Sequence, residues 1–265
     1  MKKIAIIGGG NIGGAIAHGL QQGNMIPAEN ITISDRSEKT LNKFRAITDK
    51  WKLTTSNSDA IEGADIIIIA VKPWLVESVA AELEKKIDYK NQIIISIAVG
   101  VDFEKLIRFF DKIAVIFRII PNTAIEVKES FTTIAHYNAN DEQIGYVKAL
   151  FDELGTTMIV KEEQLTPLMA LSSCGIAYAF RYIRASMEGA VEMGIYPDDA
   201  REVILQTLRG AITLLETNQS HPEVEIDKVT TPGGITIKGL NEMEANGFTN
   251  AVIKGLLKSN IAPNP

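Results

Sequence analysis

The sequence is poor in residues that form disulfides or bind metals. Its 265 residues include one cysteine, Cys174, so no disulfide can form within the chain. The three histidines, His18, His136 and His221, stand far apart and show no metal-ligand spacing. We therefore expect no metal site, and any redox chemistry needs an organic cofactor.

Long hydrophobic runs and an excess of positive charge are also missing. The longest aliphatic stretch, residues 66–71, is far shorter than the roughly 18 to 20 residues that span a bilayer. The apolar run at residues 4–7 stops at a glycine cluster, unlike that of a signal peptide. Lys and Arg number 27 against 33 Asp and Glu, so no positive excess is available to neutralise a nucleic acid or an anionic membrane. We expect a cytoplasmic protein with neither of these partners.

Short runs rich in Ile and Val alternate with helical stretches over the first 160 residues. The runs read KIAIIG, ENITISD, ADIIIIAV, QIIISIAV, KIAVIFRI, FTTIAH and TTMIV. Because most are continuous rather than alternating in polarity, they indicate strands buried on both faces, as in a parallel sheet covered by helices. Residues 1–160 are therefore predicted to form a doubly wound α/β domain.

After residue 160 the sequence becomes helical. KEEQLTPLMALSSCGIAYAFRYIRASMEGAVEMG reads as one long helix, and a second begins at Pro197 beside Asp198 and Asp199, a helix-start signature. HPEVEIDKVTTPGG reads as a turn-rich connection, and two further helices are predicted on either side of Gly247. Residues 161–265 are thus predicted to form an all-α domain, whose large apolar surface favours burial against a second copy.

The segment GGGNIGG follows a predicted strand and opens a predicted helix. In this context Gly8 fits a tight turn, Gly10 the close approach of a pyrophosphate, and Gly13 the packing of helix against strand. The alternative is a glycine-rich turn without a ligand. We predict a Rossmann-type dinucleotide-binding site.

The end of the next strand, ITISDRS, carries the candidates that contact the adenosine ribose. Asp35 stands 22 residues after Gly13, and a carboxylate there accepts the ribose hydroxyls and favours NADH. The adjoining Arg36, with Ser34 and Ser37, can instead bind a 2′-phosphate and favours NADPH. A solvated strand-end pair is the alternative, and the choice between NADPH and NADH stays open.

Two further strand ends lie at the edge where open α/β sheets bind ligands. ADIIIIAVKP ends with Lys72 and Pro73. The proline stops the strand and turns the backbone, so we expect Val71 and Lys72 beside the nicotinamide ribose. FRIIPNTAIEV ends with Pro121, Asn122 and Thr123, an amide and a hydroxyl for the same edge. A solvated lysine and an ordinary Pro-Asn-Thr turn are the alternatives.

The segment KVTTPGGITIKGL lies in the helical region. Pro232, Gly233 and Gly234 break the chain before a helix, so we expect the N–H groups of Gly234, Ile235 and Thr236 to be unpaired, with a hydroxyl from Thr236. Such a helix start binds a carboxylate, unless it is only a turn that enters a helix.

Taken in order over nearly the whole chain, these segments resemble the pyrroline-5-carboxylate reductases. The matching segments are GGGNIGGAIAHGL, AVKP, RIIPNT, SSCGIAY and TTPGGITIKGL. The resemblance implies reduction of the cyclic imine 1-pyrroline-5-carboxylate to L-proline with NADPH or NADH, the last step of proline biosynthesis. It also implies homodimers with interlocked helical domains, which often assemble into decamers.

The resemblance also implies a role for each matching residue. The pyrophosphate would be held by Gly8, Gly10, Asn11, Ile12 and Gly13, and the adenosine ribose would face Ser34, Asp35 and Arg36. Asn57, Ala70, Val71, Lys72 and Pro73 would complete the cofactor cradle, and Pro121, Asn122 and Thr123 would flank the nicotinamide. Gly234, Ile235 and Thr236 would hold the substrate carboxylate, with Thr236 and Asn122 as the candidate catalytic residues.

Several positions depart from the family pattern. The family commonly reads Ser-Gly-Ser-Gly-Pro-Ala-Tyr where this chain has SSCGIAY at residues 172–178, and Ala124 replaces a usual proline. Ile235 is bulkier than the usual residue, and Met169 stands where many members have threonine. These changes leave the identity of the substrate open. Two alternative functions also remain: a related imine or ketone reductase, and a dinucleotide-binding regulatory protein without turnover. No lysine or histidine of the helical region is placed to move the proton of a hydroxy acid.

Overall fold

The computed structural model describes residues 1–260, which divide into two compact units. Met1–Cys174 with Asn260 form the first unit, and Gly175–Ser259 form the second. The last residues of the predicted helical domain, 261–265, lie outside the described residues.

The first unit is built on an eight-stranded sheet, in the order β3-β2-β1-β4-β5-β6-β7-β8. Its strands are β1 (Ile4–Ile7), β2 (Ile31–Ser34), β3 (Lys52–Thr54), β4 (Ile66–Ile69), β5 (Ile93–Ser96), β6 (Val115–Ile120), β7 (Ser130–Tyr137) and β8 (Gly155–Ile159). Neighbouring strands are parallel except for β6 and β7. All seven predicted strands are confirmed, and β3 was missed. The strand order reverses between β1 and β4, which creates a crevice at their carboxyl ends.

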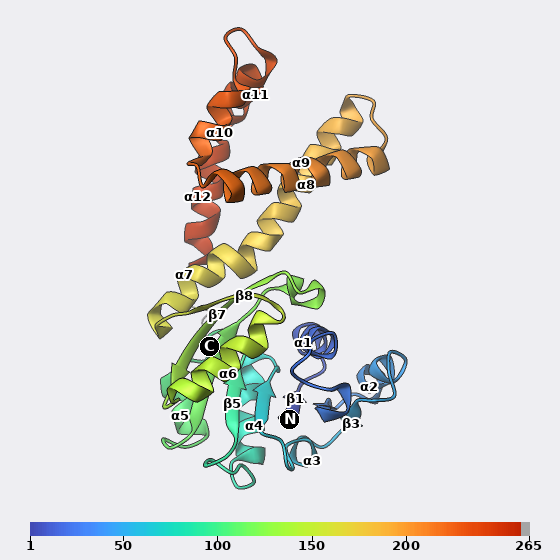
Figure 1. Cartoon of the computed structure of the whole chain (residues 1–265), viewed down its shortest axis with the longest axis vertical. Helices are drawn as coiled ribbons and strands as arrows, with labels where there is room; N and C mark the ends of the chain where they lie inside the picture. Colours follow the sequence, from blue (N-terminus) through green and yellow to red (C-terminus); the bar gives the residue numbers. More distant parts are fainter. Residues whose placement is uncertain (261–265) are drawn as a thin grey trace. The chain divides into compact units, whose positions relative to one another are not determined.

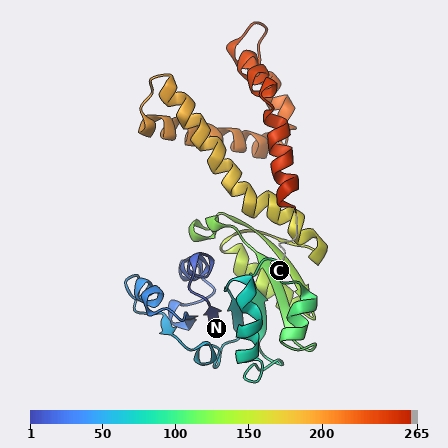
Figure 2. The ribbon, with the colours of Figure 1, turned by 180° about the vertical axis from the view of Figure 1, so that it is seen from behind.

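Helices cover both faces of this sheet (Figure 1), and Figure 2 shows the same arrangement from behind. They are α1 (Asn11–Gln21), α2 (Glu38–Arg45), α3 (Asn57–Ala60), α4 (Val76–Leu83), α5 (Phe103–Phe109), α6 (Asp141–Asp152) and α7 (Leu165–Met169). Ile4 and Ile6 of β1 pack in one buried cluster with α1 and α6, whereas Ala5 and Ile7 pack in the other with α4 and α5. Successive residues of a strand point to opposite faces, so both faces of β1 are buried and the predicted doubly wound domain is confirmed.

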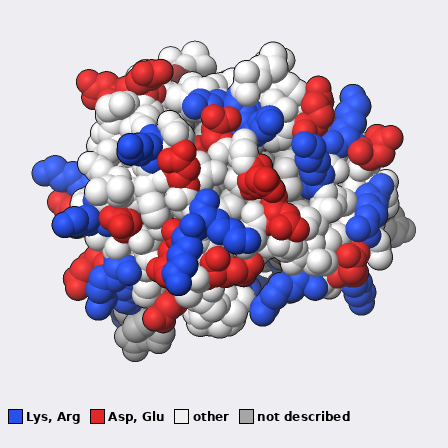
Figure 3. Space-filling view, turned by 90° about the horizontal axis from the view of Figure 1, so that it is seen from below, with Lys and Arg blue, Asp and Glu red and all other residues white. Residues whose placement is uncertain are grey.

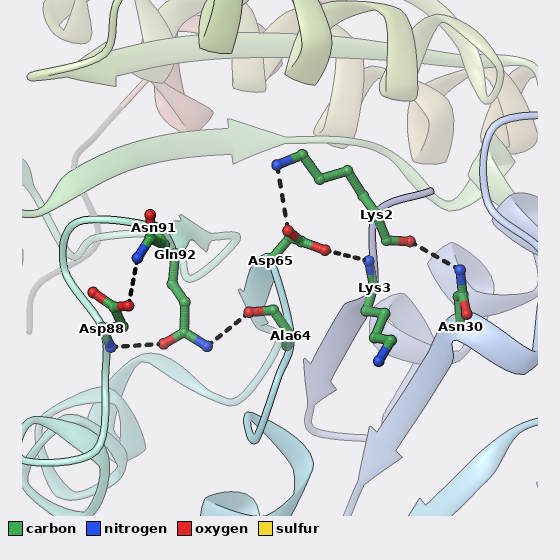
Figure 4. A network of polar contacts seen from close by, with 8 residues as sticks. All are labelled: Lys2, Lys3, Asn30, Ala64, Asp65, Asp88, Asn91 and Gln92. Carbon is green, nitrogen blue, oxygen red and sulfur yellow. Dashed lines mark hydrogen bonds and ion pairs between the residues drawn. The ribbon is translucent and has the colours of Figure 1, made fainter.

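Polar side chains close the amino ends of the central strands (Figure 4). The Asp65 carboxylate, just before β4, accepts from the backbone N–H of Lys3 at 2.7 Å and from Lys2 Nζ at 3.3 Å. Gln92, just before β5, is buried and donates to the carbonyl oxygen of Ala64 at 2.7 Å. These bonds pair the Asp65 carboxylate and the Gln92 amide within the chain, whereas the opposite edge of the sheet carries the cavity described below.

The second unit is entirely helical. It consists of α8 (Gly175–Glu192), α9 (Pro197–Asn218), α10 (Pro222–Val229), α11 (Ile235–Ala245) and α12 (Phe248–Ser259). The predicted turn-rich connection was wrong at α10. Pro222 occupies the first turn, His221 Nδ1 accepts from the N–H of Glu223, and Glu223 and Glu225 lie in the first turn, as acidic residues favour.

The long helix predicted after residue 160 is interrupted. A 3-10 turn (Glu162–Gln164) leads into α7, and a π-helical turn (Ala170–Cys174) separates α7 from α8. Single π turns within helices are frequent at functional sites. Here the turn falls on the segment that departs from the family pattern.

Hydrophobic side chains of the second unit are poorly covered within one chain. Ala190 and Ala200 are the only buried hydrophobic residues of Gly175–Ser259. Large apolar side chains are exposed on several helices, among them Phe180, Met193, Tyr196, Ile212, Leu214 and Leu257. An apolar surface of this kind marks an interaction site.

The described residues offer neither a membrane span nor a metal cluster. None of the helices within residues 1–260 is long and apolar enough to cross a bilayer. The same residues bring no three His, Cys, Asp or Glu side chains together around a possible metal ion. On the face that Figure 3 shows, basic and acidic side chains are interspersed.

Candidate functional site

A cavity of about 880 Å³ opens at the carboxyl ends of the central strands of the first unit. It is lined by Gly8, Gly10, Asn11 and Ile12 after β1, by Ser34, Asp35 and Arg36 after β2, and by residues 70–73 after β4. Asn57 and Thr123 also line it. The structure thus brings most of the predicted cofactor residues to one wall, at the point where the strand order reverses.

The glycine loop has the geometry expected of a pyrophosphate cradle. Gly8 has φ +107°, and a Cβ there would lie 2.7 Å from the carbonyl oxygen of Ala70. A Cβ at Gly13 would lie 2.0 Å from the carbonyl oxygen of Gly8, so Gly13 serves helix packing and does not line the cavity. Gly10 has open space around it and begins α1 without a side-chain cap. The first N–H groups of α1 are therefore available to an anion, which fits a dinucleotide.

Asp35 is fixed against the glycine loop. One carboxylate oxygen accepts from the N–H of Gly9 at 2.9 Å, and the other accepts from the N–H of Ser37 at 2.8 Å. The neighbouring Arg36 is exposed and makes no ion pair with any residue from 1 to 260. Both residues that are predicted to contact the adenosine ribose, Asp35 and Arg36, therefore line the cavity.

Behind this wall runs a chain of side-chain hydrogen bonds. The buried Ser34 Oγ donates to Asn57 Oδ1 at 2.7 Å, and Asn57 Nδ2 donates to Glu82 Oε2 at 2.9 Å. Glu82 comes from α4 and lines the cavity. Sequence reasoning missed it, because nothing distinguishes it from the other glutamates of its helix.

Several further lining residues, most of them apolar, were also not predicted from the sequence. Leu75, Ser78 and Val79 line the cavity from η2 (Pro73–Leu75) and α4, and residues 97–99 line it after β5. The β5 segment carried a usable signal, because its strand ends at the same edge as the others. The residues of α4 carried none.

The three residues predicted at the end of β6 do not all line the cavity. Thr123 lines the cavity, whereas Pro121 and Asn122 do not. Asn122 is buried, and its Oδ1 accepts from the N–H of Ala124 at 2.9 Å. The resemblance leads us to expect a proline at position 124. A proline has no N–H and could not donate this hydrogen bond to Asn122 Oδ1. A catalytic role for Asn122 stays a prediction.

Lys72 lines the cavity, whereas Ser173 lies outside the cavity lining and contacts the segment after β6. Lys72 is exposed at the start of η2 and pairs with no acidic side chain of the described part of the chain. Ser173, in the π-helical turn, donates from Oγ to the carbonyl oxygen of Pro121 at 2.7 Å. This contact joins a departure from the family pattern to the Pro-Asn-Thr segment.

The predicted carboxylate-binding residues belong to the second unit. Gly234 is the N-cap of α11, Gly233 has φ +73°, and no side chain caps this helix. The expectation of a free N–H at Gly234 was wrong, since the turn closes with this N–H donating to the carbonyl oxygen of Thr231 at 2.9 Å. Ile235 is 87% exposed, and Thr236 follows it in the first turn. The open start of α11 is thus formed by Ile235 and Thr236 rather than by Gly234.

Known families match both parts of the chain. Residues 162–260 match the family model for pyrroline-5-carboxylate reductase dimerisation, and residues 3–100 match that for coenzyme F420-dependent NADP oxidoreductase. A pyrroline-5-carboxylate reductase 2 of Dictyostelium discoideum is 35% identical, over 97% of this chain and 91% of its own length. A pyrroline-5-carboxylate reductase 1 of the same organism is 38% identical over 97% of this chain, which spans about half (48%) of that relative.

Solved structures agree over the whole length. The pyrroline carboxylate reductase of Plasmodium falciparum, solved with NADP bound, has a TM-score of 0.90 at 27% identity and covers 98% of this chain and 95% of its own. The 1-pyrroline-5-carboxylate reductase of Streptococcus pyogenes has a TM-score of 0.87 at 31% identity, over 98% and 96% of the two chains. The resemblance identified in the sequence is confirmed, and the chain belongs to the pyrroline-5-carboxylate reductases.

Proposed function

We infer that this protein reduces 1-pyrroline-5-carboxylate to L-proline with NADPH or NADH, the last step of proline biosynthesis. One observation carries the inference. The cavity at the strand-order reversal has a glycine loop that fits a pyrophosphate, in a chain similar to known reductases along almost its entire length. The protein is an oxidoreductase that acts on a C=N bond.

The reaction requires little acid or base catalysis from the protein. A cyclic imine is basic enough to be protonated near neutral pH, so its ring carbon is already electrophilic. When bound, the reduced nicotinamide supplies the hydride. The residues of the chain then have to bind and orient both molecules, and alignment alone lowers a barrier substantially.

The start of α1 and the cavity wall supply the binding side. The N–H groups that follow Gly10 would donate to the pyrophosphate, and we propose that residues 70–73 with Thr123 flank the nicotinamide half. The apolar side chains of residues 97–99 would keep water from part of the bound cofactor. Pro121 and Asn122 are proposed to support the same segment from behind.

The substrate carboxylate needs an anion site, and the open start of α11 is our proposal for it. The N–H groups of Ile235 and Thr236 and the hydroxyl of Thr236 would donate to it, and Gly234 shapes the turn. A hydrogen bond to a charged group contributes about 1.5 to 3 kcal/mol, so Thr236→Ala is expected to lower kcat/KM about 10-fold or more. Thr236→Ser keeps the hydroxyl and should keep most of the activity. Unchanged kinetics in Thr236→Ala would remove Thr236 from the site.

The reaction is tested by following the absorbance of reduced nicotinamide with purified protein and 1-pyrroline-5-carboxylate, beside a six-membered cyclic imine acid. Fast oxidation with the five-membered ring supports the proposal. Turnover with only the larger ring would assign a related imine reductase. Tight cofactor binding without any turnover would favour a regulatory protein.

We further propose the setting in which the reaction takes place. Residues 161–265 would bind the substrate and form a homodimer, with dimers assembling as far as decamers, and the protein would work in the cytoplasm without a nucleic-acid or membrane partner. The apolar side chains exposed on the second unit support the dimer. Light scattering of the purified protein and fractionation of cells test these points.

A further inference from the structure

Two carboxylates line the cavity of the first unit: Asp35, which was predicted from the sequence, and Glu82, which was not. Asp35 follows β2, and Glu82 comes from α4, the helix that begins shortly after β4. Glu82 is exposed toward the cavity and makes no ion pair with the described residues. Its negative charge is therefore not neutralised by a neighbouring side chain.

The hydrogen-bond chain shows which part of the cavity Glu82 faces. Glu82 accepts from Asn57, and Asn57 accepts from Ser34, which directly precedes Asp35. Glu82 is thus two hydrogen bonds away from the end of β2. In Rossmann-type domains this strand end is where the adenosine ribose binds.

The positive charges on the same wall are Arg36 and Lys72. Lys72 follows β4, whereas Arg36 follows β2 and is exposed. Near the end of β2 the lining therefore carries one exposed guanidinium and two carboxylates, and Asp35 is fixed by two backbone N–H groups.

We propose that Glu82, together with Asp35, selects against the 2′-phosphate, so that the protein binds NADH more tightly than NADPH. This rests on the function proposed above. A phosphate monoester adds about 1.5 to 2 negative charges near neutral pH, which two carboxylates repel. An ionised carboxylate is also an acceptor only, so it bonds a ribose hydroxyl and offers nothing to a phosphate oxygen.

The test measures binding, with no substrate present. Dissociation constants of NADH and NADPH are determined from nicotinamide fluorescence for the wild type and for Glu82→Gln. Glutamine removes the charge but keeps an oxygen that accepts from Asn57, so the wall should keep its shape. We expect the NADPH constant to fall about 3-fold or more, as for one solvent-screened charge, and the NADH constant to stay nearly unchanged.

Two further variants sharpen the result. Glu77→Gln removes the same charge from the same helix at a position that does not line the cavity, and should change neither constant. Glu82→Lys reverses the charge and should favour NADPH further, with a gain that shrinks at high salt because the site is exposed.

The outcomes separate this inference from the proposed function. A wild type that prefers NADPH, or a Glu82→Gln variant with an unchanged NADPH-to-NADH ratio, would overturn the inference and leave the reductase assignment intact. A protein that binds neither dinucleotide would overturn the cofactor assignment itself, and the inference with it.

Discussion

The two units of the chain differ in how far they complete their own cores. The first unit has buried clusters on both faces of its sheet, whereas the second buries only Ala190 and Ala200 among its hydrophobic residues. The second unit lies almost wholly within the segment that matches the dimerisation family model. The first unit thus buries its core within one chain, whereas the apolar side chains of the helical unit stay exposed, and we expect homo-oligomerisation to cover them.

The largest effect is expected from a substitution that leaves a cavity in the buried core of the first unit. Phe117, in β6, is fully buried in the cluster on one face of the sheet. Phe117→Ala should lower the free energy of unfolding of the first unit by about 3 to 5 kcal/mol, because the residual cavity adds to the lost burial. Denaturant unfolding measures this loss, and it should not depend on protein concentration. A loss that grows on dilution would mean that the first unit, too, is completed by a partner copy.

A charge on the second unit should act on assembly instead. Phe180, on α8, is 60% exposed within one chain. If a second copy covers it, Phe180→Asp buries a charge and should raise the dissociation constant of the oligomer about 10-fold or more. Sedimentation velocity over a dilution series measures this change. Ile47→Asp, at a residue 47% exposed in the first unit, is the matched control and should leave assembly unchanged. Equal dissociation constants for the two variants would contradict the expected difference between the two units.

The sequence predicted the elements of the fold whose residues carry a strong local pattern, and missed those without one. The seven predicted strands were recognisable because continuous Ile and Val runs indicate burial on both faces. β3 was missed because it has only three residues and begins with the exposed Lys52. α10 was missed because its Thr-Thr-Pro-Gly-Gly continuation is rich in turn residues, although Pro222 and the acidic first turn carry the same signal that identified α9.

The residues of the site could be predicted where a single segment of the sequence contains the complete motif. Gly8, Gly10 and Asp35 belong to local patterns whose spacing has a physical reason. Glu82 reaches the cavity only because α4 packs beside α3, and no spacing in the sequence records this contact. The bond that pairs the Gly234 N–H depends on the left-handed turn at Gly233, which a sequence pattern does not specify.

The smallest effect is expected at the surface of the second unit, where polar contacts rather than a core fix a helix start. Glu225 of α10 accepts from Lys228 at 2.7 Å, and also from Ser220 and Asn218. These hydrogen bonds, that from Lys228 first, lower the pKa of Glu225 to about 2. Because the folded pKa lies below the ordinary value, the stabilisation is complete above about pH 4.5 and is lost as the pH falls toward about 2.

Comparison of Glu225→Gln with the wild type in thermal unfolding tests this pH dependence. The wild type should have the higher Tm at pH 6, and the difference should shrink between pH 4.5 and 2 as Glu225 becomes protonated. Glu223→Gln, on the same helix but without an ion pair to a described residue, should show no such convergence. Because Glu225 lies at the surface and its partner Lys228 is exposed, the shift in Tm should be small and should decrease with added salt. A difference that stays constant down to pH 2 would mean that packing, and not the charge of Glu225, holds the start of α10.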